Sequence, residues 1–178
     1  MKKKHILKEI LSFGLQLAVV VLLGIFLRNT VIVHAQVLSP SMESTIATGG
    51  RVIGSRLSYV IGEPQRFDII VFENPIDPTN HPFVKRIIGL PYETVTIRNG
   101  LVYINDSDTP LDDFFTKEAS FGNHGPFIVP SDSFFVLGDH RNNSLDSRTL
   151  ANPFIHRDVI TGRLFATYFP RPAWFRRP

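Results

Sequence analysis

Two serines separated by one residue are the first feature of this sequence that could do chemistry. In Ser39-Pro40-Ser41-Met42, one hydroxyl can attack a carbonyl carbon while the other donates a hydrogen bond to the oxyanion that forms. Serine and proline are also typical of a turn that ends a strand. The residues alone are therefore consistent with a nucleophile and its oxyanion donor and, more simply, with a turn that has no catalytic role.

A lysine lies among apolar residues in the segment 83–89, Phe-Val-Lys-Arg-Ile-Ile-Gly. If this segment is a strand, Phe83, Lys85 and Ile87 share one face, and burial of that face disfavours the charged ammonium. At an ordinary pKa of about 10.4, roughly one lysine in 2,500 is neutral at pH 7, and lowering that pKa by about 3.4 costs roughly 4.6 kcal/mol. The alternative is that Lys85 extends from an edge strand into water and stays charged.

A dense polar segment, Gly138 to Arg148, follows the apolar run 133–137. Within it, Asp146 and Arg148 can form a charge-assisted pair that braces a loop, and Ser144 can form a hydrogen bond with a nearby amine. A solvated turn is the alternative, but eleven such residues are more than a connection between two apolar strands requires.

Other catalytic and binding classes find no support in the sequence. It contains no cysteine, which excludes disulfide scaffolds and thiolate zinc sites, and it lacks the glycine-rich phosphate loops, the G-x-S-x-G elbow and the H-E-x-x-H metal motif. None of its six histidines makes a pair at metal-ligand spacing, so neither a metal nor a cofactor is predicted. The net charge of +3 equals that of residues 1–10 alone, so no nucleic-acid partner is predicted.

A long apolar run near the N-terminus predicts a transmembrane helix over residues 10–28. The run has 18 residues without a charge, and a helix of that length is roughly 27 Å long, close to the thickness of the bilayer hydrocarbon. Lysines precede the run, so the basic tail 1–9 is predicted to be cytoplasmic and the body to lie on the far side. The alternative is a cleavable signal peptide with its site at Val33-His34-Ala35, although Arg28 separates the run from that site.

The rest of the chain, residues 29–178, predicts a mainly β body. It holds many prolines and glycines and no second long helical period, and Asn99-Gly100 is a strong signal for a two-residue hairpin. The polar stretch at about 105–130 is expected to be an irregular excursion or a small subdomain. We expect a folded, partly closed antiparallel β body, with strands at Thr30–Leu38, Arg51–Ser55, Phe67–Phe72, Pro82–Gly89, Thr94–Arg98, Leu101–Asn105, Ser133–Leu137 and Val159–Tyr168.

Taken in order, these features resemble the bacterial type I signal peptidases, also called leader peptidases. The resemblance covers most of the chain: an anchor, Ser-x-Ser-Met, Lys-Arg-x-x-Gly-x-Pro, and Gly-Asp-x-Arg-x-x-Ser-x-Asp-Ser-Arg. It implies that Ser41 is the nucleophile and Lys85 the general base of a Ser-Lys dyad. It also implies that the Ser39 hydroxyl and the Ser41 backbone N–H form the oxyanion hole. The implied supporting residues are Ser144, which orients the Lys85 amine, the ion-paired Asp146 and Arg148, and Asp139 and Arg86.

Two of these segments depart from the usual pattern of that family. Pro40 stands where glycine is common between the two serines, and His140 stands where asparagine is common. Neither departure removes a catalytic group. Pro40 lacks an N–H, however, and it stiffens the turn that carries the oxyanion hole.

The resemblance implies a membrane-anchored serine endopeptidase that removes signal peptides from exported preproteins. It implies a fold shared with LexA-like proteins, a single span in the bacterial cell membrane, and an extracytoplasmic catalytic domain at 29–178. Its partners are expected to be preproteins and the lipid bilayer, without cofactor or metal, and the sequence indicates no oligomeric state. The alternatives are a self-cleaving Ser-Lys protease of the LexA and UmuD kind, which shares the dyad and a related β fold, and a non-enzymatic anchored β domain.

Overall fold

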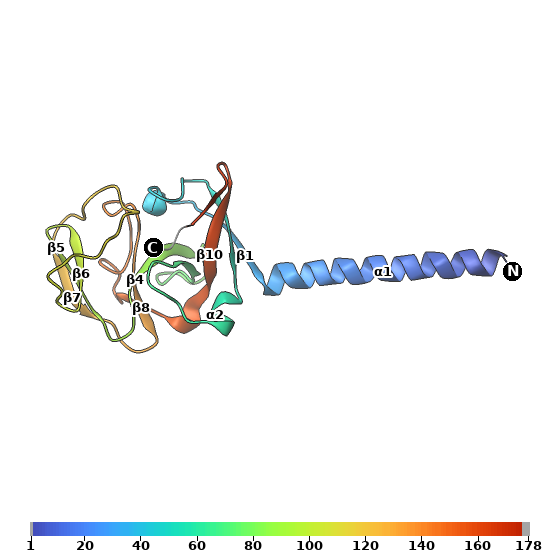
Figure 1. Ribbon diagram of the computed structural model, residues 1–178, viewed down its shortest axis with the longest axis horizontal. Coiled ribbons are helices and arrows are strands. Elements are labelled where there is room, and N and C mark those ends of the chain that lie inside the picture. The colour runs from blue at the N-terminus through green and yellow to red at the C-terminus, as the bar shows by residue number, and fades with distance from the viewer. Residues whose placement is uncertain (1, 176–178) are drawn as a thin grey trace.

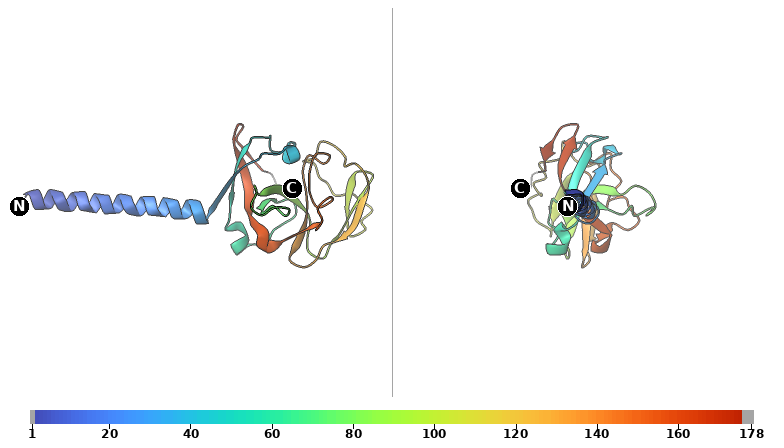
Figure 2. Two further views of the ribbon diagram at one scale, coloured as in Figure 1. Left: turned by 180° about the vertical axis from the view of Figure 1, so that it is seen from behind. Right: turned by 90° about the vertical axis from the view of Figure 1, so that its right-hand side faces the viewer.

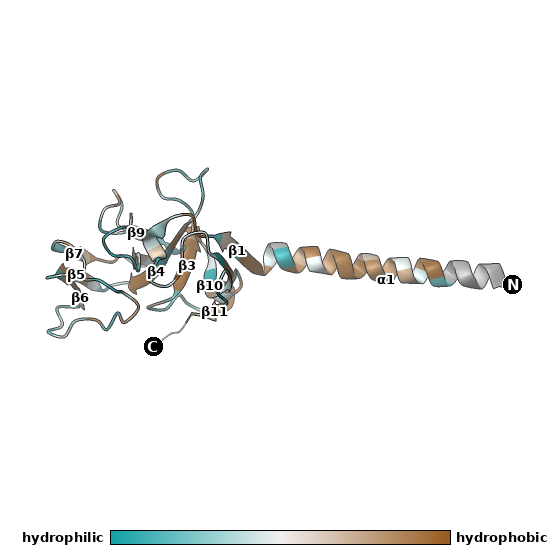
Figure 3. Cartoon of the chain, turned by 90° about the horizontal axis from the view of Figure 1, so that it is seen from above, coloured by the Kyte–Doolittle hydropathy of each residue, from teal (hydrophilic) through white to brown (hydrophobic). Residues whose placement is uncertain are grey.

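One long helix precedes the β body in the computed structural model, which describes residues 2–175 (Figure 1). Helix α1 runs from Lys2 to Thr30, so it extends beyond the predicted span at both ends. Its segment Glu9–Arg28 is long and apolar enough to cross a membrane, and nothing else in the described chain buries it. The left view in Figure 2 shows the helix projecting away from the body, and the right view looks along its axis; Figure 3 shows that apolar residues cover most of its length.

Within residues 2–175, the main sheet has eight strands that follow one another in the order β1-β2-β10-β3-β4-β8-β9, with β11 beside β10. Each neighbouring pair is antiparallel. The strands are β1 (Ile32–Gln36), β2 (Arg51–Ser55), β3 (Ile69–Phe72), β4 (Phe83–Gly89), β8 (Ser133–Leu137), β9 (Phe154–His156), β10 (Ile160–Phe169) and β11 (Ala173–Trp174). The short helices are α2 (Ser58–Ile61), η1 (Pro40–Met42) and η2 (Arg157–Val159).

A second sheet packs at the end of the body away from α1 (Figure 1), with the strand order β6-β5-β7. Strands β5 (Thr94–Arg98) and β6 (Leu101–Ile104) form the predicted hairpin. Its two turn residues, Asn99 and Gly100, both have positive φ, which is the requirement of a type I′ turn. Strand β7 (His124–Ile128) pairs with β5, so the stretch expected to be irregular or a small subdomain contributes a strand to this sheet.

The main sheet curls on itself, which confirms the predicted partly closed antiparallel body. Three strands lie between β1 and β4 in the sheet order, so a flat sheet would separate them by roughly 19 Å. Residues of both strands nevertheless line one groove, for example Ala35 from β1 and Lys85 from β4. The two strands therefore face each other across the inside of the curl.

Strand β4 lies between β3 and β8 and is buried on both faces. Ile87 packs with Phe134 in one core cluster, while Ile88 packs with Val95 in another. Residues 84–89 are all buried, and Lys85 itself is only 4% exposed. The alternative in which Lys85 reaches water from an edge strand is therefore wrong.

Helix α1 passes into the sheet without a linker. The Val31 N–H donates to the Leu27 carbonyl as the last helical bond, over 2.9 Å, and the Val31 carbonyl accepts the N–H of Arg56, also over 2.9 Å. The proposed cleavage site Val33-His34-Ala35 lies within β1, where it pairs with β2. One continuous segment thus leads from the helix through β1 to Ser39.

We predict that Gly54→Ala destabilises the body, because β2 and β10 approach closely at this position. A Cβ added at Gly54 would lie 2.1 Å from the Arg163 carbonyl oxygen, and overpacking of this kind lowers the free energy of unfolding by about 2–3 kcal/mol. Urea unfolding followed by circular dichroism measures the change. Gly14→Ala is the control, since a Cβ there meets nothing within 4 Å; equal midpoints for the two variants would contradict the prediction.

Candidate active site

Ser41 sits in a tight turn directly after β1. The backbone is still extended at Ser39, with φ −113° and ψ 153°, and then enters the 3-10 turn η1. Proline suits the first position of such a turn because its φ is preset and the missing N–H has no helical partner there. Met42 is fully buried in the same core cluster as Ile46. The side chain of Met42 therefore fixes the turn to the core, and Ser41 itself is only 4% exposed.

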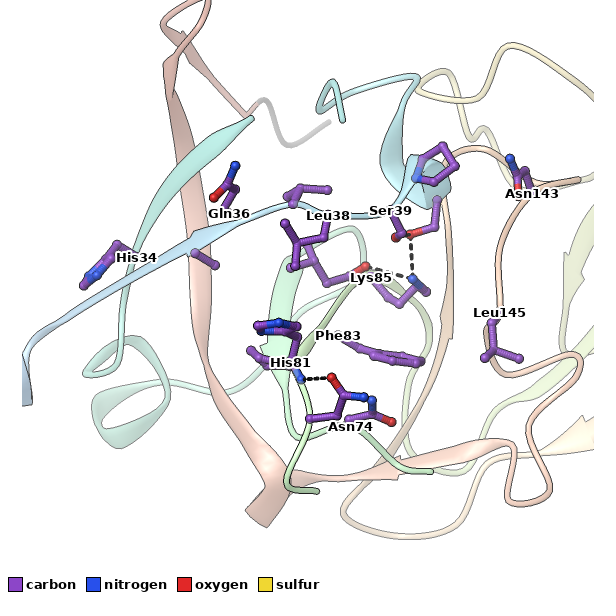
Figure 4. A pocket seen from close by; sticks show the side chains of 17 residues that line it. His34, Gln36, Leu38, Ser39, Asn74, His81, Phe83, Lys85, Asn143 and Leu145 are labelled. Carbon is purple, nitrogen blue, oxygen red and sulfur yellow. Dashed lines mark hydrogen bonds between the residues drawn. The ribbon is translucent and has the colours of Figure 1, made fainter. Parts of the chain in front are cut away.

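The amine of Lys85 reaches Ser41 from the middle of the curled sheet. Lys85 Nζ lies 2.7 Å from Ser41 Oγ and 3.1 Å from the carbonyl oxygen of Val84, and the lysine is 4% exposed. Ser39 Oγ lies 3.0 Å from Ser41 Oγ. Figure 4 shows Ser39 and Lys85 approaching each other from the two walls of the groove. The first two sequence segments thus meet at one hydroxyl.

Burial makes the charged form of Lys85 less favourable than that of a lysine in water. Desolvation is the main reason that the pKa of the Lys85 amine falls from 10.5 to about 8, and the charges of Asp146 and Asp139 oppose the fall. With such a pKa, about one molecule in ten carries a neutral amine at pH 7. A lowered pKa is what an amine needs in order to act as a general base near neutral pH.

Arg86 and Asp139, which were expected only to have supporting roles, form a buried ion pair next to the site. Arg86 Nε donates to Asp139 Oδ1 over 2.8 Å and Arg86 Nη2 to Oδ2 over 2.6 Å, a two-pronged contact that guanidinium and carboxylate geometry favours. The Thr45 hydroxyl also donates to Asp139. The residue next to the lysine in β4 is thereby tied both to the polar segment 138–148 and to the turn that follows Ser41.

The predicted pair of Asp146 and Arg148 closes the polar segment on itself. Arg148 donates through Nε and Nη2 to the two Asp146 oxygens, each over 2.8 Å. The Gly138 N–H donates to Asp146 Oδ2 over 3.0 Å, and Arg148 also donates to the Arg141 carbonyl. A further bond, from Arg148 Nη1 to Ser120 Oγ, fixes the loop against the excursion. The segment is a braced loop rather than a solvated turn.

Ser144 lies beside the dyad without the hydrogen bond expected of it. A Cβ added at Gly138 would lie 2.2 Å from Ser144 Oγ and 2.6 Å from the Ser41 carbonyl oxygen, so all three residues crowd together. Ser144 Oγ is buried, and within the described residues it has no hydrogen-bond partner. The glycine at 138 is needed because any side chain there would displace Ser144 or Ser41.

The sequence argument did not assign a site role to Thr45 or His140, although both contact the site. His140 donates its backbone N–H to the Ser41 carbonyl over 3.0 Å, and its ring Nδ1 lies 3.2 Å from the Pro40 carbonyl oxygen. The only signal in the sequence was that His140 belongs to the polar segment, next to Asp139. Thr45 carried no signal at all, because a hydroxyl in a turn is unremarkable.

A groove of about 690 Å³ opens beside Ser41 and Lys85. One wall is β1 with Leu38, and the other carries Phe83 and Leu145 (Figure 4). Strand β4 pairs with β8 only from Arg86 onward, and β1 is the edge of the sheet. Two stretches of unpaired strand edge therefore border the groove. Among residues 2–175, no group of three or more histidine, aspartate or glutamate side chains is placed to hold a metal ion.

A buried serine hydroxyl in contact with a desolvated amine, a second hydroxyl within 3.0 Å and an adjoining groove are the groups that a serine hydrolase with an amine base would require. A family model described as signal peptidase, peptidase S26 matches residues 10–169. A probable signal peptidase I-2 of Synechocystis sp. is 36% identical over 167 residues, which cover 91% of this chain and 74% of that protein. The chain therefore belongs to the signal peptidase family S26.

Further proteins of the same family resemble this chain. A signal peptidase I of Leptolyngbya laminosa is 40% identical over 162 residues, covering 86% of this chain and 76% of that protein. A solved structure of a signal peptidase I from Enterococcus faecalis V583 is 33% identical and covers 58% of this chain and 97% of that chain, with a TM-score of 0.48.

We predict that peptide hydrolysis depends on the neutral form of Lys85. Because the pKa of this amine is about 8, kcat/KM should rise about tenfold per pH unit below pH 8 and level off above it. A fluorogenic signal-peptide substrate assayed from pH 6 to pH 10 measures the profile, with circular dichroism as the control for folding at each pH. A midpoint near the ordinary lysine value would contradict the prediction, since it would mean that the amine is solvated.

Proposed function

We propose that this chain is a membrane-anchored serine endopeptidase that removes signal peptides from exported preproteins, with Ser41 as nucleophile and Lys85 as general base. Family membership supports the reaction. The observation that carries the assignment of residues is the 2.7 Å contact between a poorly solvated amine and a buried hydroxyl. Desolvation favours the neutral form of a lysine in that setting, and a neutral amine can accept a proton.

Acylation begins when neutral Lys85 takes the proton of Ser41 and Oγ attacks the carbonyl carbon of the scissile bond. The oxyanion receives hydrogen bonds from the Ser39 hydroxyl and the Ser41 backbone N–H. When the tetrahedral intermediate collapses, the C–N bond breaks and the Lys85 ammonium gives its proton to the leaving amine. An ester joins the signal peptide to Ser41. Lys85 then removes a proton from water, which attacks the ester and releases the signal peptide as an acid.

The groove suits an extended peptide. An extended chain can form backbone hydrogen bonds with an unpaired strand edge, and both β1 and the residues 83–85 of β4 offer such edges. The groove walls near Ser41 carry the apolar side chains of Leu38, Phe83 and Leu145. We propose that small apolar residues before the cleavage site bind there, in accord with the resemblance to leader peptidases.

Two buried ion pairs keep the segments around Ser41 and Lys85 in place. Arg86 with Asp139 and Arg148 with Asp146 fix the loop that packs on Ser41, and Ser144 Oγ is the remaining polar group close to this turn. We propose that Ser144 turns its unpaired hydroxyl to the Lys85 amine during the reaction and orients it. Each of these residues acts on the dyad rather than on the substrate.

We predict that Ser41→Ala and Lys85→Met each reduce cleavage of a preprotein by at least about a thousandfold, because neither partner of a dyad works alone. Methionine keeps the length of the lysine side chain in the buried site but cannot accept a proton. Gel assays with purified protein in detergent micelles measure the product. Ser44→Ala and Lys117→Met are the controls and should keep full activity; full activity of Lys85→Met with loss in Ser41→Ala would point to a different base.

For the membrane arrangement, we propose a cytoplasmic tail at 1–9, an anchor at 10–28 and an extracytoplasmic domain at 29–178. The lysines before the apolar segment favour this orientation, and the uncovered apolar surface of α1 requires lipid around it. Because α1 continues directly into β1, enzyme and membrane-bound substrate meet at one face of the bilayer, which raises their effective concentration.

We predict that a reporter enzyme fused after the last residue is active only if it is one that works outside the cytoplasm, such as alkaline phosphatase. The matched fusion to β-galactosidase, which works only in the cytoplasm, should be inactive. Replacing the four lysines of residues 1–8 with glutamate should weaken this preference, since the positive charges set the orientation. Activity of the β-galactosidase fusion of the unaltered chain would overturn the proposed topology.

A further inference from the structure

His140 holds both peptide groups that flank the nucleophile. Its backbone N–H donates to the Ser41 carbonyl over 3.0 Å, which fixes the peptide group that follows Ser41. Its ring Nδ1 lies 3.2 Å from the Pro40 carbonyl oxygen, in the peptide group that precedes Ser41. The Pro40 oxygen accepts a second bond, from the Glu43 N–H over 2.9 Å. His140 therefore contacts the turn at two carbonyl groups, one before and one after the Ser41 side chain.

The Pro40 carbonyl and the Ser41 N–H belong to the same planar peptide group. Fixing the direction of the carbonyl therefore fixes the direction of the N–H, which points the opposite way. A hydrogen bond accepted by the carbonyl also polarises the group and makes its N–H a better donor. Under the proposed function, this N–H is one of the two donors to the oxyanion, and a misplacement of about 1 Å in a catalytic group can slow a reaction about a hundredfold.

We propose that the His140 ring is a positioning residue that aims the Ser41 N–H at the oxyanion by holding the Pro40 carbonyl. This inference rests on the proposed function. It adds a role for a side chain that touches neither the substrate nor the reacting atoms.

The surroundings of the ring keep a hydrogen on Nδ1. A carbonyl oxygen can only accept, so the contact with Pro40 requires Nδ1–H. On the other side, ring Nε2 lies 3.5 Å from Glu118 Oε1, and that carboxylate also accepts the Asn142 N–H over 2.9 Å. With hydrogen on Nδ1 the ring donates to the Pro40 carbonyl, while Nε2 faces the Glu118 carboxylate. Glu43 and Lys117 are the other charged groups around this small hollow.

Pro40 and His140, which both depart from the family pattern, are thus in direct contact. A proline between the serines has no N–H with which to hold the turn, so its carbonyl is the group that remains available. The histidine ring supplies a donor to that carbonyl. An asparagine at 140 would place its amide nitrogen at the same distance from the backbone as Nδ1, and could donate in the same way.

The test compares side chains of similar shape that differ in the donor. His140→Leu removes the donor, His140→Asn keeps it, and His140→Ala separates loss of the donor from a packing effect of leucine. His156→Leu, at an exposed position in β9 outside the site, is the matched control. For each purified full-length protein, kcat and KM are measured with a signal-peptide substrate, together with inhibition constants for a peptide aldehyde and for the product peptide.

Expected results follow from a role in the transition state. Leucine and alanine should each lower kcat about tenfold while KM stays within twofold, because the oxyanion exists only after attack. The aldehyde, which forms an oxyanion on Ser41, should bind about tenfold more weakly, while the product peptide binds as before. The asparagine variant and the His156→Leu control should stay within two- to threefold of the unaltered chain in all four constants.

Three results would overturn the inference. One is unchanged kcat and aldehyde affinity in the leucine and alanine variants. Another is an asparagine variant as impaired as leucine, which would assign the effect to ring shape. The third is an equal loss of aldehyde and product binding, which would mean that the ring only supports the groove. If the unaltered chain fails to cleave any signal peptide, it is the proposed function that fails.

Discussion

Lys85 Nζ can accept a proton from Ser41 Oγ only when it is neutral, and it is neutral near pH 7 only if the amine is kept from water. The fall of the lysine pKa from 10.5 to about 8 corresponds to roughly 3 kcal/mol of unfavourable burial of the charged form, which the folded body must offset elsewhere. A position on an exposed edge would leave the amine charged. The site therefore depends on the burial of Lys85, which is 4% exposed although β4 pairs with β8 only from Arg86 onward.

Two buried carboxylates work against this requirement. Asp146 and Asp139 raise the pKa of Lys85, because a nearby negative charge favours the ammonium. Each carboxylate has a guanidinium in two-pronged contact, Arg148 for the first and Arg86 for the second. These arginines offset the negative charge that the amine would otherwise feel. The ion pairs thus brace the loop and also protect the base from being held in its charged form.

Local patterns in the sequence predicted much of this arrangement. The apolar run of α1, the hairpin at Asn99-Gly100 and the strand that carries Lys85 each follow from periodicity or turn chemistry over a few residues. The order of the strands, in contrast, depends on pairings between distant segments, and β7 was missed because its sequence, His-Gly-Pro-Phe-Ile, contains two residues that disfavour strands.

The difference between local patterns and contacts between distant segments also explains which features of the site could be predicted. The three candidate segments were recognised because each places polar groups that could do chemistry within a short stretch, and the resemblance joined them. The structure shows where the adjacent side chains of Asp139 and His140 go: Asp139 accepts from Arg86, and the His140 ring contacts the Pro40 carbonyl. Neither partner is close in the sequence, so no local pattern could assign it.

Ser41 and Lys85 meet only when the whole sheet has formed. They belong to segments that β2, β10 and β3 separate in the sheet order, and β10 is close to the end of the chain. Ser41 comes after α1 and β1 in the chain. Lys85 and the polar segment reach it only through contacts between residues that are 44 and 100 positions apart in the sequence. Until the sheet is complete, Lys85 is therefore an ordinary solvated lysine that lacks its contact with Ser41.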